Sequence, residues 1–465
     1  MKVEQIYTGC LAQGAYYIVS GDQAAIIDPL RETKPYLDRA AKDGVKIKYI
    51  FETHFHADFV SGHIDLAKAT GAPIVYGPTA DPKFSAYIAQ DGEQFTIGDC
   101  MLTVLHTPGH TLESSCFLLT DEEHKDYALF TGDTLFIGDV GRPDLAQKAA
   151  HMTQEELAGL LYESLQKKII PLSDNVLVYP AHGAGSACGK HMSKETISTI
   201  GNQKKTNYAL RADLTKEKFI EEVIEGLLPP PNYFPMNVKM NKEGYDAIDQ
   251  VLKRGIHPLP VNDFEASANN TNALILDTRS PEIFVKGFIP NSINIGMDGS
   301  FAPWVGALIP DIKQKILLVT MPGKEEEAVT RLARVGYDHV IGYLKGGFQS
   351  WLDNKKEIDM IESASASTLA GIINDQSLQL VDVRKPDEFG TEHVSMAQNI
   401  PLDFINDHMV DFSLSKPIYI HCAGGYRSTI AASILKSRGF DNVINIDGGF
   451  NEIKKTQIPT TASIS

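Results

Sequence analysis

Two long segments in the second half of the chain resemble each other, and this internal repeat most limits the folds available. Residues 273–295 match residues 378–400, and residues 315–351 match residues 416–453, so the repeat has a period of roughly 100 residues. Each copy reads as strand, loop, helix and strand, with Gly-Gly-Phe after the last strand. Because a unit of this length can bury its own core, we expect two small α/β domains rather than a solenoid of short repeats.

A break rich in proline and asparagine, at residues 226–245, separates the repeat from the first part of the chain. Its run of three prolines, 229–231, cannot continue a helix and favours an extended segment. Before the break, β-rich runs alternate with helical patterns, which is typical of a layered α/β fold. We therefore predict three domains, at residues 1–245, 250–357 and 362–465, with the serine-rich stretch at 363–367 joining the last two.

Composition and charge exclude several classes of function. The chain has 43 Lys and Arg against 59 Asp and Glu, a net charge of −16, and no basic patch. This argues against nucleic acid and against an anionic membrane as partners. There is no apolar run long enough to span a membrane, and the first residues do not resemble a secretory signal. The odd, sparse set of five cysteines indicates a reducing, cytoplasmic compartment rather than a disulfide framework.

Histidines and aspartates follow the β-rich runs of the first domain. The segment THFHADFVSGH at 53–63 has a His-x-His-x-Asp spacing, and the motifs TPGHT, FTGDTLF and YPAHGAGS come later. Imidazole and carboxylate groups are the usual ligands of first-row divalent metals. Any one of these residues could be an ordinary polar loop residue, but the set predicts a metal site. Its candidate residues are His54, His56, Asp58, His110, Asp133 and His182.

These motifs resemble those of the metallo-β-lactamase fold, an αββα sandwich of two sheets with a metal site at its edge. The hydrolases of this fold, including glyoxalase II, carry His-x-His-x-Asp-His, in which the Asp and the final His hold a second zinc. Phe59 stands at that last position here, so the resemblance makes a two-metal hydrolytic mechanism less favoured. His63 is a weaker substitute ligand, since a histidine that opens a helix is more often structural.

The persulfide dioxygenases of this superfamily hold one iron with the first His of the motif, the TPGH His and the GD Asp. The resemblance implies His54, His110 and Asp133 as ligands of one Fe(II) per chain, a facial triad with open positions for O₂ and a substrate sulfur. The segment GDTLFIGDVGRPD at 132–144 resembles the same family. The residues expected to orient these ligands or to contact substrate are His56, Asp58, His182, Arg142 and Cys188.

Two of those residues have alternative interpretations. Arg142 either pairs with Asp144 to shape the site or binds an anionic substrate. Cys188 is either a buried small residue or a thiol that accepts sulfur.

A thioester hydrolase of the glyoxalase II type fused to a sulfurtransferase is the main alternative function. A persulfide sensor or scaffold with a structural metal is a third, although structural sites usually close four ligands.

The second strong motif is HCAGGYRS at 421–428, where the strand-like run KPIYI leads into Cys422, a Gly-rich loop and a helix. Such a loop directs backbone N–H groups inward, and the helix N-terminus adds partial positive charge, so both stabilise a thiolate or a bound persulfide. The loop resembles the active-site loop of rhodanese sulfurtransferases. This implies that Cys422 carries sulfane sulfur and that Arg427 binds the anionic acceptor or braces the loop. The other loop residues expected to bind the persulfide are Ala423, Gly424, Gly425, Tyr426 and Ser428.

The middle copy departs from this pattern, because it has VTMPGKEEEA where the last domain has IHCAGGYRST. Met321 or a neighbour occupies the nucleophile position, and the acidic run 325–327 would repel sulfite. We therefore expect a catalytically silent rhodanese domain that serves as a spacer or docking element.

The order of metallo-β-lactamase fold, silent rhodanese and active rhodanese resembles persulfide dioxygenase–rhodanese fusions of sulfide detoxification. The fold class expected is α/β, an αββα sandwich followed by two small rhodanese-like domains. The implied reaction oxidises a small thiol persulfide, of glutathione, coenzyme A or a similar thiol, with O₂ and water to sulfite. Cys422 then transfers sulfane sulfur to sulfite, or from thiosulfate in the reverse direction. Many relatives form oligomers, so a homo-oligomer is expected, without nucleic acid or membrane.

Overall fold

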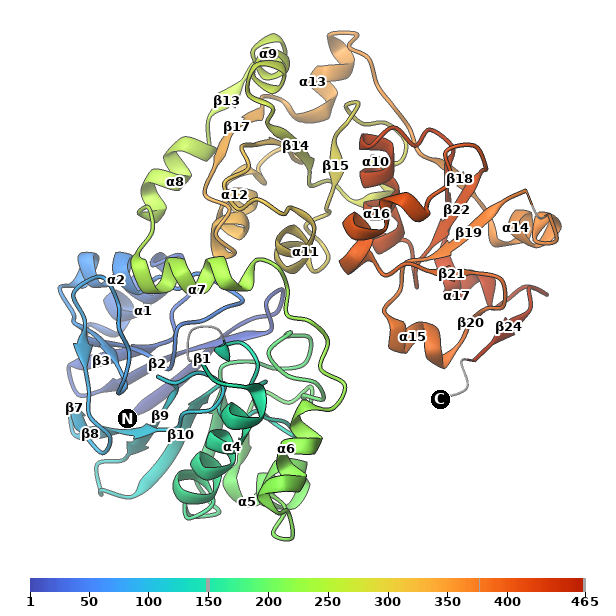
Figure 1. The fold of residues 1–465 in the computed structure, drawn as a ribbon. Coiled ribbons are helices and arrows are strands. Elements are labelled where there is room, and N and C mark those ends of the chain that lie inside the picture. The colour runs from blue at the N-terminus through green and yellow to red at the C-terminus, as the bar shows by residue number, and fades with distance from the viewer. Residues whose placement is uncertain (148–150, 376, 463–465) are drawn as a thin grey trace. The chain divides into compact units, whose positions relative to one another are not determined.

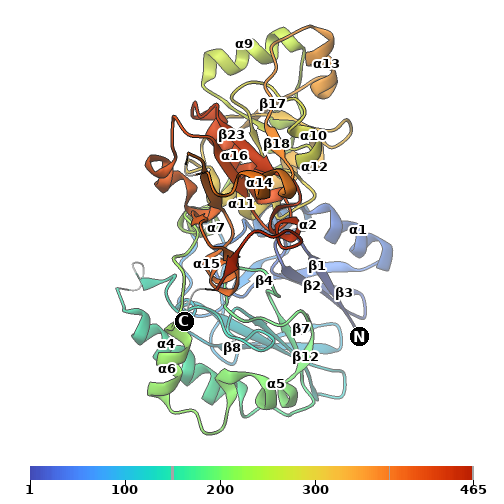
Figure 2. The same cartoon turned by 90° about the vertical axis from the view of Figure 1, so that its right-hand side faces the viewer.

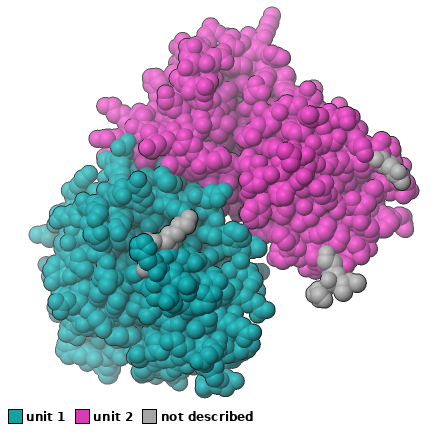
Figure 3. All heavy atoms as spheres, viewed as in Figure 1, with its two compact units in different colours: residues 1–248, 333–336 teal, residues 249–332, 337–465 magenta. Residues whose placement is uncertain are grey.

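The computed structural model describes residues 1–147, 151–375 and 377–462 of the chain. By its contacts the chain divides into two compact units, one of residues 1–248 with 333–336 and one of residues 249–332 with 337–465 (Figures 1 and 3). The domains predicted at 1–245 and 362–465 include residues 148–150, 376 and 463–465, which lie outside the described residues.

The first unit contains two six-stranded sheets. The first sheet has the strand order β1-β2-β3-β4-β5-β6, and the second has the order β12-β11-β10-β9-β8-β7. In the first sheet the bounds are β1 (Lys2–Thr8), β2 (Gln13–Ser20), β3 (Gln23–Ile27), β4 (Lys46–Glu52), β5 (Ile74–Tyr76) and β6 (Tyr87–Ile88). In the second they are β7 (Gln94–Ile97), β8 (Cys100–His106), β9 (Ser115–Thr120), β10 (Asp126–Gly132), β11 (Leu177–Pro180) and β12 (Ser198–Thr199). Both sheets are mixed: β3 to β6 run parallel in the first, and β10 runs parallel to β11 in the second.

Three apolar clusters show how these sheets are layered. One lies between the sheets and draws side chains from both, among them Ile18 and Phe51 on one side and Leu102 and Phe130 on the other. A second lies between the outer face of the first sheet and two helices, α1 (Lys34–Asp43) and α2 (His63–Thr70). The third lies between the second sheet and helices α4 (Gln154–Ser164), α5 (Ile200–Thr206) and α6 (Lys216–Ile224). The result is the predicted αββα sandwich, which Figure 2 shows layer by layer.

Local sequence explains where the helices of this unit begin. Thr153 caps α4, because its hydroxyl accepts the Glu156 N–H while the Glu156 carboxylate accepts the Thr153 N–H. The remaining helical elements among the described residues of this unit are a π-helical turn (Leu165–Ile169), a 3₁₀ turn (Tyr208–Leu210) and α7 (Phe234–Glu243). Helix α8 (Ile248–Gly255) begins at the last residue of the segment 1–248 and continues into the second unit. The polar break predicted at 226–245 is therefore extended only in part, since Pro235 sits in the first turn of α7, where its missing N–H leaves no bond unmade.

The second unit contains two five-stranded parallel sheets with the same topology. Their strand orders are β13-β17-β16-β14-β15 and β18-β23-β22-β19-β21, so each strand of one copy has a counterpart in the other. The middle copy has strands β13 (Pro258–Leu259), β14 (Leu274–Asp277), β15 (Ile293–Asn294), β16 (Ile316–Val319) and β17 (Val340–Leu344). Its helices are α9 (Val261–Thr271), α10 (Pro281–Phe284), α11 (Phe301–Leu308), α12 (Glu325–Arg334) and α13 (Gly347–Asp353). The two α/β domains predicted from the repeat are confirmed.

The last copy carries the corresponding elements and one addition. Its strands are β18 (Glu362–Ala364), β19 (Gln379–Asp382), β21 (Gln398–Asn399), β22 (Ile418–His421) and β23 (Val443–Ile446). Its helices are α14 (Ala366–Ile372), α15 (Pro386–Thr391), a 3₁₀ segment (Leu402–Asp411), α16 (Tyr426–Ser437) and α17 (Gly449–Ile453). The addition is a short antiparallel pair, β20 (His393–Val394) with β24 (Thr460–Thr461). Throughout the described chain, no helix is both long and apolar enough to cross a membrane.

Candidate metal centre and nucleophile loop

The candidate metal ligands of the first unit follow the ends of strands. His54 follows β4, His110 follows β8, and Asp133 follows β10 directly. All three are buried, and one ligand atom from each lies within 4.8 Å of the others. His54 Nε2 lies 3.8 Å from Asp133 Oδ2, and His110 Nε2 lies 3.4 Å from the same oxygen. The strand ends thus bring together residues that are up to 79 positions apart in the sequence, His54 and Asp133.

The free oxygen of Asp133 fits a bound cation. Asp133 Oδ1 accepts a hydrogen bond from His182 Nδ1 at 2.8 Å, whereas Oδ2 is buried and accepts none from the described residues. A buried carboxylate oxygen without a partner is strongly disfavoured unless a positive charge lies beside it. Burial opposes the charged form of Asp133, but His182, His54 and His110 outweigh it and hold the pKa of this carboxyl far below its usual value.

Hydrogen bonds orient His54 and His110 so that Nε2 of each ring faces Asp133 Oδ2. His110 Nδ1 faces the Arg142 carbonyl at 2.8 Å, and since a carbonyl can only accept, Nδ1 carries the proton. His54 Nδ1 faces Thr53 Oγ1 at 3.0 Å. The single hydroxyl proton of Thr53 is donated to Asp28 Oδ2 at 2.9 Å, so His54 Nδ1 must donate in turn. Burial, followed by the charge of His56, lowers the pKa of His54 and keeps it neutral.

His182 links the candidate ligand Asp133 to Asp58. Its Nε2 lies 2.7 Å from Asp58 Oδ2, while its Nδ1 bonds Asp133. Burial disfavours the imidazolium, but the two carboxylates outweigh burial and raise the pKa of His182 well above its usual value. Cys188 lies in the same buried group as Asp58 and His182, within 4.8 Å. Burial, and then the Asp58 and Asp133 charges, raise the pKa of the Cys188 thiol. In these surroundings Cys188 is a thiol rather than a thiolate.

His56 belongs to a separate buried group with Asp28 and Glu52. Its Nε2 lies 3.1 Å from Asp28 Oδ1 and 3.7 Å from Glu52 Oε2, so this nitrogen is turned toward those carboxylates. The Phe59 ring is fully buried, with its centroid 4.3 Å from that of His56. His63 lies against the other oxygen of Glu52 at 3.4 Å, and burial lowers its pKa to about 3. The geometry therefore places His63 with Glu52 and outside the three-residue group of Asp133.

The side chain of Arg142 is occupied by protein partners. Its Nε and one Nη donate to Asp144 at 2.6 and 2.7 Å, and its remaining contacts are the carbonyls of Ala187 and Leu228. Its own carbonyl accepts the His110 proton, and its N–H donates to the Cys188 carbonyl at 3.0 Å. Of the two interpretations of Arg142, this geometry favours the pair with Asp144 that shapes the site over binding of an anionic substrate.

In the last domain, Cys422 begins a tight loop between β22 and α16. Its side chain is 1% exposed, and its sulfur accepts the Gly425 N–H at 3.1 Å. Gly425 caps α16 with φ of 110°, a conformation that favours glycine. Behind the loop, the Cys422 carbonyl accepts the Phe450 N–H at 2.7 Å, so the Gly-Gly-Phe segment holds the loop in place. The sulfur thus lies where a helix N-terminus and a backbone N–H stabilise negative charge.

Arg427 is braced by a residue that sequence reasoning did not single out. Its two Nη atoms donate to the two oxygens of Glu388 at 2.5 and 2.8 Å. The hydrogen bond from Arg427 lowers the pKa of Glu388 despite opposing burial. Glu388 lies in the segment DVRKPDEF at 382–389, inside the repeated stretch 378–400, and this position was the available signal in the sequence. Asp28, which directly follows β3, is a second functional residue that the sequence analysis did not single out.

The two rhodanese-like copies share a buried ion pair but differ at the position of the nucleophile. Asp382 and Arg384 form a buried ion pair, and Asp277 and Arg279 form its counterpart in the middle copy. Met321, at the place of Cys422 in the middle copy, is 45% exposed.

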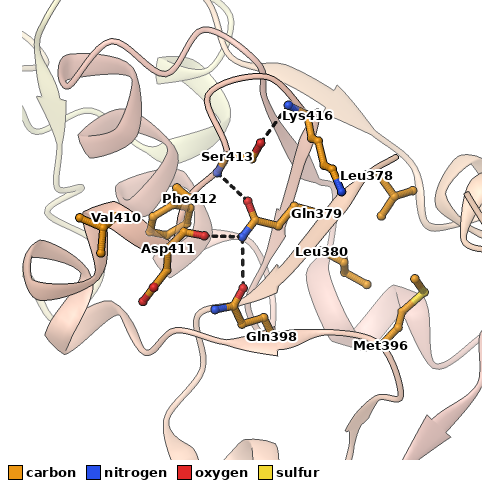
Figure 4. A pocket seen from close by; sticks show the side chains of 10 residues that line it. All are labelled: Leu378, Gln379, Leu380, Met396, Gln398, Val410, Asp411, Phe412, Ser413 and Lys416. Atoms are coloured by element: carbon orange, nitrogen blue, oxygen red, sulfur yellow. Dashed lines mark hydrogen bonds between the residues drawn. The ribbon is translucent and has the colours of Figure 1, made fainter. Parts of the chain in front are cut away.

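A pocket of about 430 Å³ in the last domain is lined by residues including Gln379 and Lys416 (Figure 4). Gln379 pairs with Ile418 at the start of β22, so this pocket lies at the opposite end of the strand from Cys422.

Comparison with known proteins identifies a family for each part of the chain. The metallo-beta-lactamase superfamily model matches residues 8–182, and the rhodanese-like domain model matches residues 261–354 and 365–456. Human mitochondrial persulfide dioxygenase ETHE1 is 30% identical over 221 residues, which cover 47% of this chain and 78% of that protein. Hydroxyacylglutathione hydrolase from Tolumonas auensis is 37% identical over 171 residues, which cover 36% of this chain and 60% of the hydrolase.

Among solved structures, a crystal structure of a metallo-beta-lactamase from Staphylococcus aureus is similar over more of the chain. It has 33% sequence identity and a TM-score of 0.64, and the match covers 74% of this chain and 98% of that one. The similarity therefore extends well beyond the αββα sandwich.

Proposed function

Because the chain belongs to the metallo-beta-lactamase superfamily, with persulfide dioxygenases among its homologues, and continues into two rhodanese-like domains, we propose that it oxidises a thiol persulfide and transfers sulfane sulfur. The first domain would catalyse RSSH + O₂ + H₂O → RSH + H₂SO₃. The last domain would exchange sulfur between Cys422 and the sulfite–thiosulfate pair. We propose a small thiol such as glutathione or coenzyme A as the carrier and the reducing cytoplasm as the compartment, a proposal that the free cysteines support.

The observation that carries the first activity is the convergence of His54 Nε2, His110 Nε2 and the unbonded Asp133 Oδ2. Two imidazoles and one carboxylate form the facial set typical of non-haem Fe(II) oxygenases, which leaves positions open for O₂ and substrate. Fe(II) bound there would supply the O₂ chemistry. The chain's own residues orient the donors: the Arg142 carbonyl and the Thr53 hydroxyl set the two histidine tautomers, and His182 engages Asp133 Oδ1.

The second activity rests on the Cys422 loop. With a sulfane sulfur on Cys422, the sulfite sulfur attacks the outer sulfur atom and forms a new S–S bond. The S–S bond to Cys422 breaks, and its electron pair stays on the Cys422 sulfur, which the Gly425 N–H and the start of α16 stabilise. The products are thiosulfate and the thiolate. The reverse sequence loads Cys422 from thiosulfate.

A thioester hydrolase is the competing function, and the 37% identity to a hydroxyacylglutathione hydrolase favours it. Phe59 argues against it, since its buried ring occupies the position where the two-metal hydrolases of this fold carry a histidine. The Asp58–His182 pair would then lack that ligand for a second zinc.

One preparation of the full chain decides between these functions. Loaded with Fe(II), it should consume O₂ when given glutathione persulfide and should leave a glutathione thioester intact. Loaded with zinc, it should neither consume O₂ nor hydrolyse the thioester. Thioester hydrolysis without persulfide-dependent O₂ uptake would refute the proposed function and establish the hydrolase.

A further inference from the structure

A turn of the middle domain lies directly on the Cys422 loop. The Tyr426 hydroxyl donates a hydrogen bond to the Gly296 carbonyl at 2.7 Å. The Tyr426 ring covers Gly299 so closely that a Cβ there would lie 2.3, 2.5 and 2.8 Å from three ring carbons. No Cβ tolerates such distances, so the ring fits only because residue 299 has none. We call residues 296–299 the seat of Tyr426.

The two copies of the repeat show that this seat is particular to the middle domain. The match of 273–295 with 378–400 sets position 296 against Pro401 and position 299 against Phe404. The alignment holds in space: Asn294 donates to the carbonyls of residues 277 and 279, and Asn399 donates to the corresponding carbonyls of residues 382 and 384. Where the last domain has a proline and a phenylalanine, the middle domain therefore has two glycines that admit the ring.

The seat is held from behind by the silent domain's own helix α12. Arg331 donates to the Met297 carbonyl at 2.7 Å, and its other Nη donates to Glu327 at 2.5 Å. Glu327 belongs to the acidic run that replaces the sulfur-binding loop in this copy. A second link lies beside the seat, where the Asn294 N–H donates to Ser433 Oγ in α16 at 2.9 Å, with both residues buried. Helix α16 packs against β15 at this point (Figure 1).

Tyr426 occupies the position in the loop where this anchoring matters most. It lies between Gly425, whose N–H contacts the Cys422 sulfur, and Arg427, which is braced by Glu388. It is also the first residue of α16. Fixing its side chain fixes the start of the helix and hence the direction of the Gly425 N–H. Burial raises the pKa of Tyr426, so its hydroxyl remains a donor at neutral pH.

We infer that the silent middle domain is a working part of the Cys422 site, and that Gly296 and Gly299 position Tyr426 so that the loop stabilises the charged sulfur. The inference rests on the proposed function only in taking Cys422 as the sulfur carrier. By this inference the middle domain takes part in sulfur transfer through contacts with Tyr426, and none of its own residues needs to touch the sulfur. Tyr426 and the two glycines are positioning residues in this scheme.

The test is Gly299→Ala in the full chain, measured by the pH profile of Cys422 alkylation with iodoacetamide, read by peptide mass. Because the added methyl displaces the ring, we expect alkylation of Cys422 at neutral pH to slow about tenfold, as expected for losing one hydrogen bond to a charged group. The profile should move to higher pH. Thiosulfate–cyanide sulfur transfer should lose kcat by a similar factor, with less change in KM.

Two further variants keep the result interpretable. Gly371→Ala is the matched control, since Gly371 lies in α14 with open space around it, and it should behave as wild type. Tyr426→Phe keeps the ring and removes only the hydroxyl, so it should shift the profile in the same direction by less. A Gly299→Ala profile that coincides with wild type would overturn the inference. Sulfur transfer that survives Cys422→Ser would instead overturn the proposed function, while the alkylation profiles would still decide the role of the seat.

Discussion

His182→Gln is the substitution that most sharply separates orientation of the metal ligands from ligation itself. His182 bonds Asp133 Oδ1 at 2.8 Å and lies 2.7 Å from Asp58 Oδ2, and it is fully buried. A glutamine amide is uncharged and carries both N–H donors on a single nitrogen, so it does not replace two ring nitrogens that face two carboxylates. Asp133 then loses the bond that leaves its Oδ2 aimed at His54 and His110. A hydrogen bond to a charged group contributes about 1.5–3 kcal/mol. Since about 1.4 kcal/mol equals one factor of ten, we expect iron to bind roughly 10–100-fold more weakly.

The assay is chelator competition for Fe(II) on the full chain, followed by O₂ uptake with persulfide at saturating iron. His408→Gln is the matched control, because His408 makes a similar bond of 2.7 Å to Asp411 but is 46% exposed on its side chain and lies in the last domain. It should leave iron affinity unchanged. If His182→Gln bound iron within about threefold of wild type, the argument that His182 orients Asp133 would be refuted.

Four further substitutions test other contacts. His110→Ala and Asp133→Ala should each abolish iron binding and O₂ uptake together, and full activity in either, by metal analysis and an oxygen electrode, would exclude the triad. Phe59→His should allow a second metal ion per chain, counted by mass spectrometry of metals, and should destabilise the metal-free protein by about 1–3 kcal/mol because it buries a polar ring; a count that stays at one would contradict it. Glu388→Gln should lower the melting temperature slightly above pH 4.5, and this difference should disappear only at more acidic pH, below the lowered folded pKa of Glu388. Arg427 depresses the pKa of Glu388 from 4.5, so its contribution is present above that value and disappears as pH falls through the lower folded pKa. The pair is partly exposed, so the effect is below about 1 kcal/mol, and a difference that persists in acid would contradict its origin in Glu388.

The sequence was sufficient for the architecture and for the identity of the clustered residues. The repeat predicted two domains of one topology, and their strand orders agree. The motif positions predicted a site after strand ends, and His54, His110 and Asp133 do meet there. These predictions succeed because β8 and β10, both antiparallel to β9, end at the same edge of the second sheet, and β-rich runs followed by polar residues already indicate such strand ends.

Contacts between distant residues could not be predicted in the same way. The proton of His54 is assigned only through Thr53 and Asp28, and Asp28 is 25 residues from Thr53. The contact of Tyr426 with residue 296 spans 130 residues and depends on missing side chains, which leave no positive signal in a single sequence. The donors of Arg142 are satisfied by carbonyls of residues 187 and 228, and backbone acceptors carry no signature in residue type.

The central claim is that persulfide oxidation at the first domain and sulfur transfer at Cys422 occur in one chain. The most direct test measures O₂ uptake, sulfite and thiosulfate together, with iron-loaded protein and glutathione persulfide. The wild-type chain should consume O₂ and accumulate thiosulfate, whereas Cys422→Ser should consume O₂ at the same rate and accumulate sulfite. Thiosulfate formed undiminished by Cys422→Ser, or no O₂ uptake by wild-type protein with iron bound, would contradict the account.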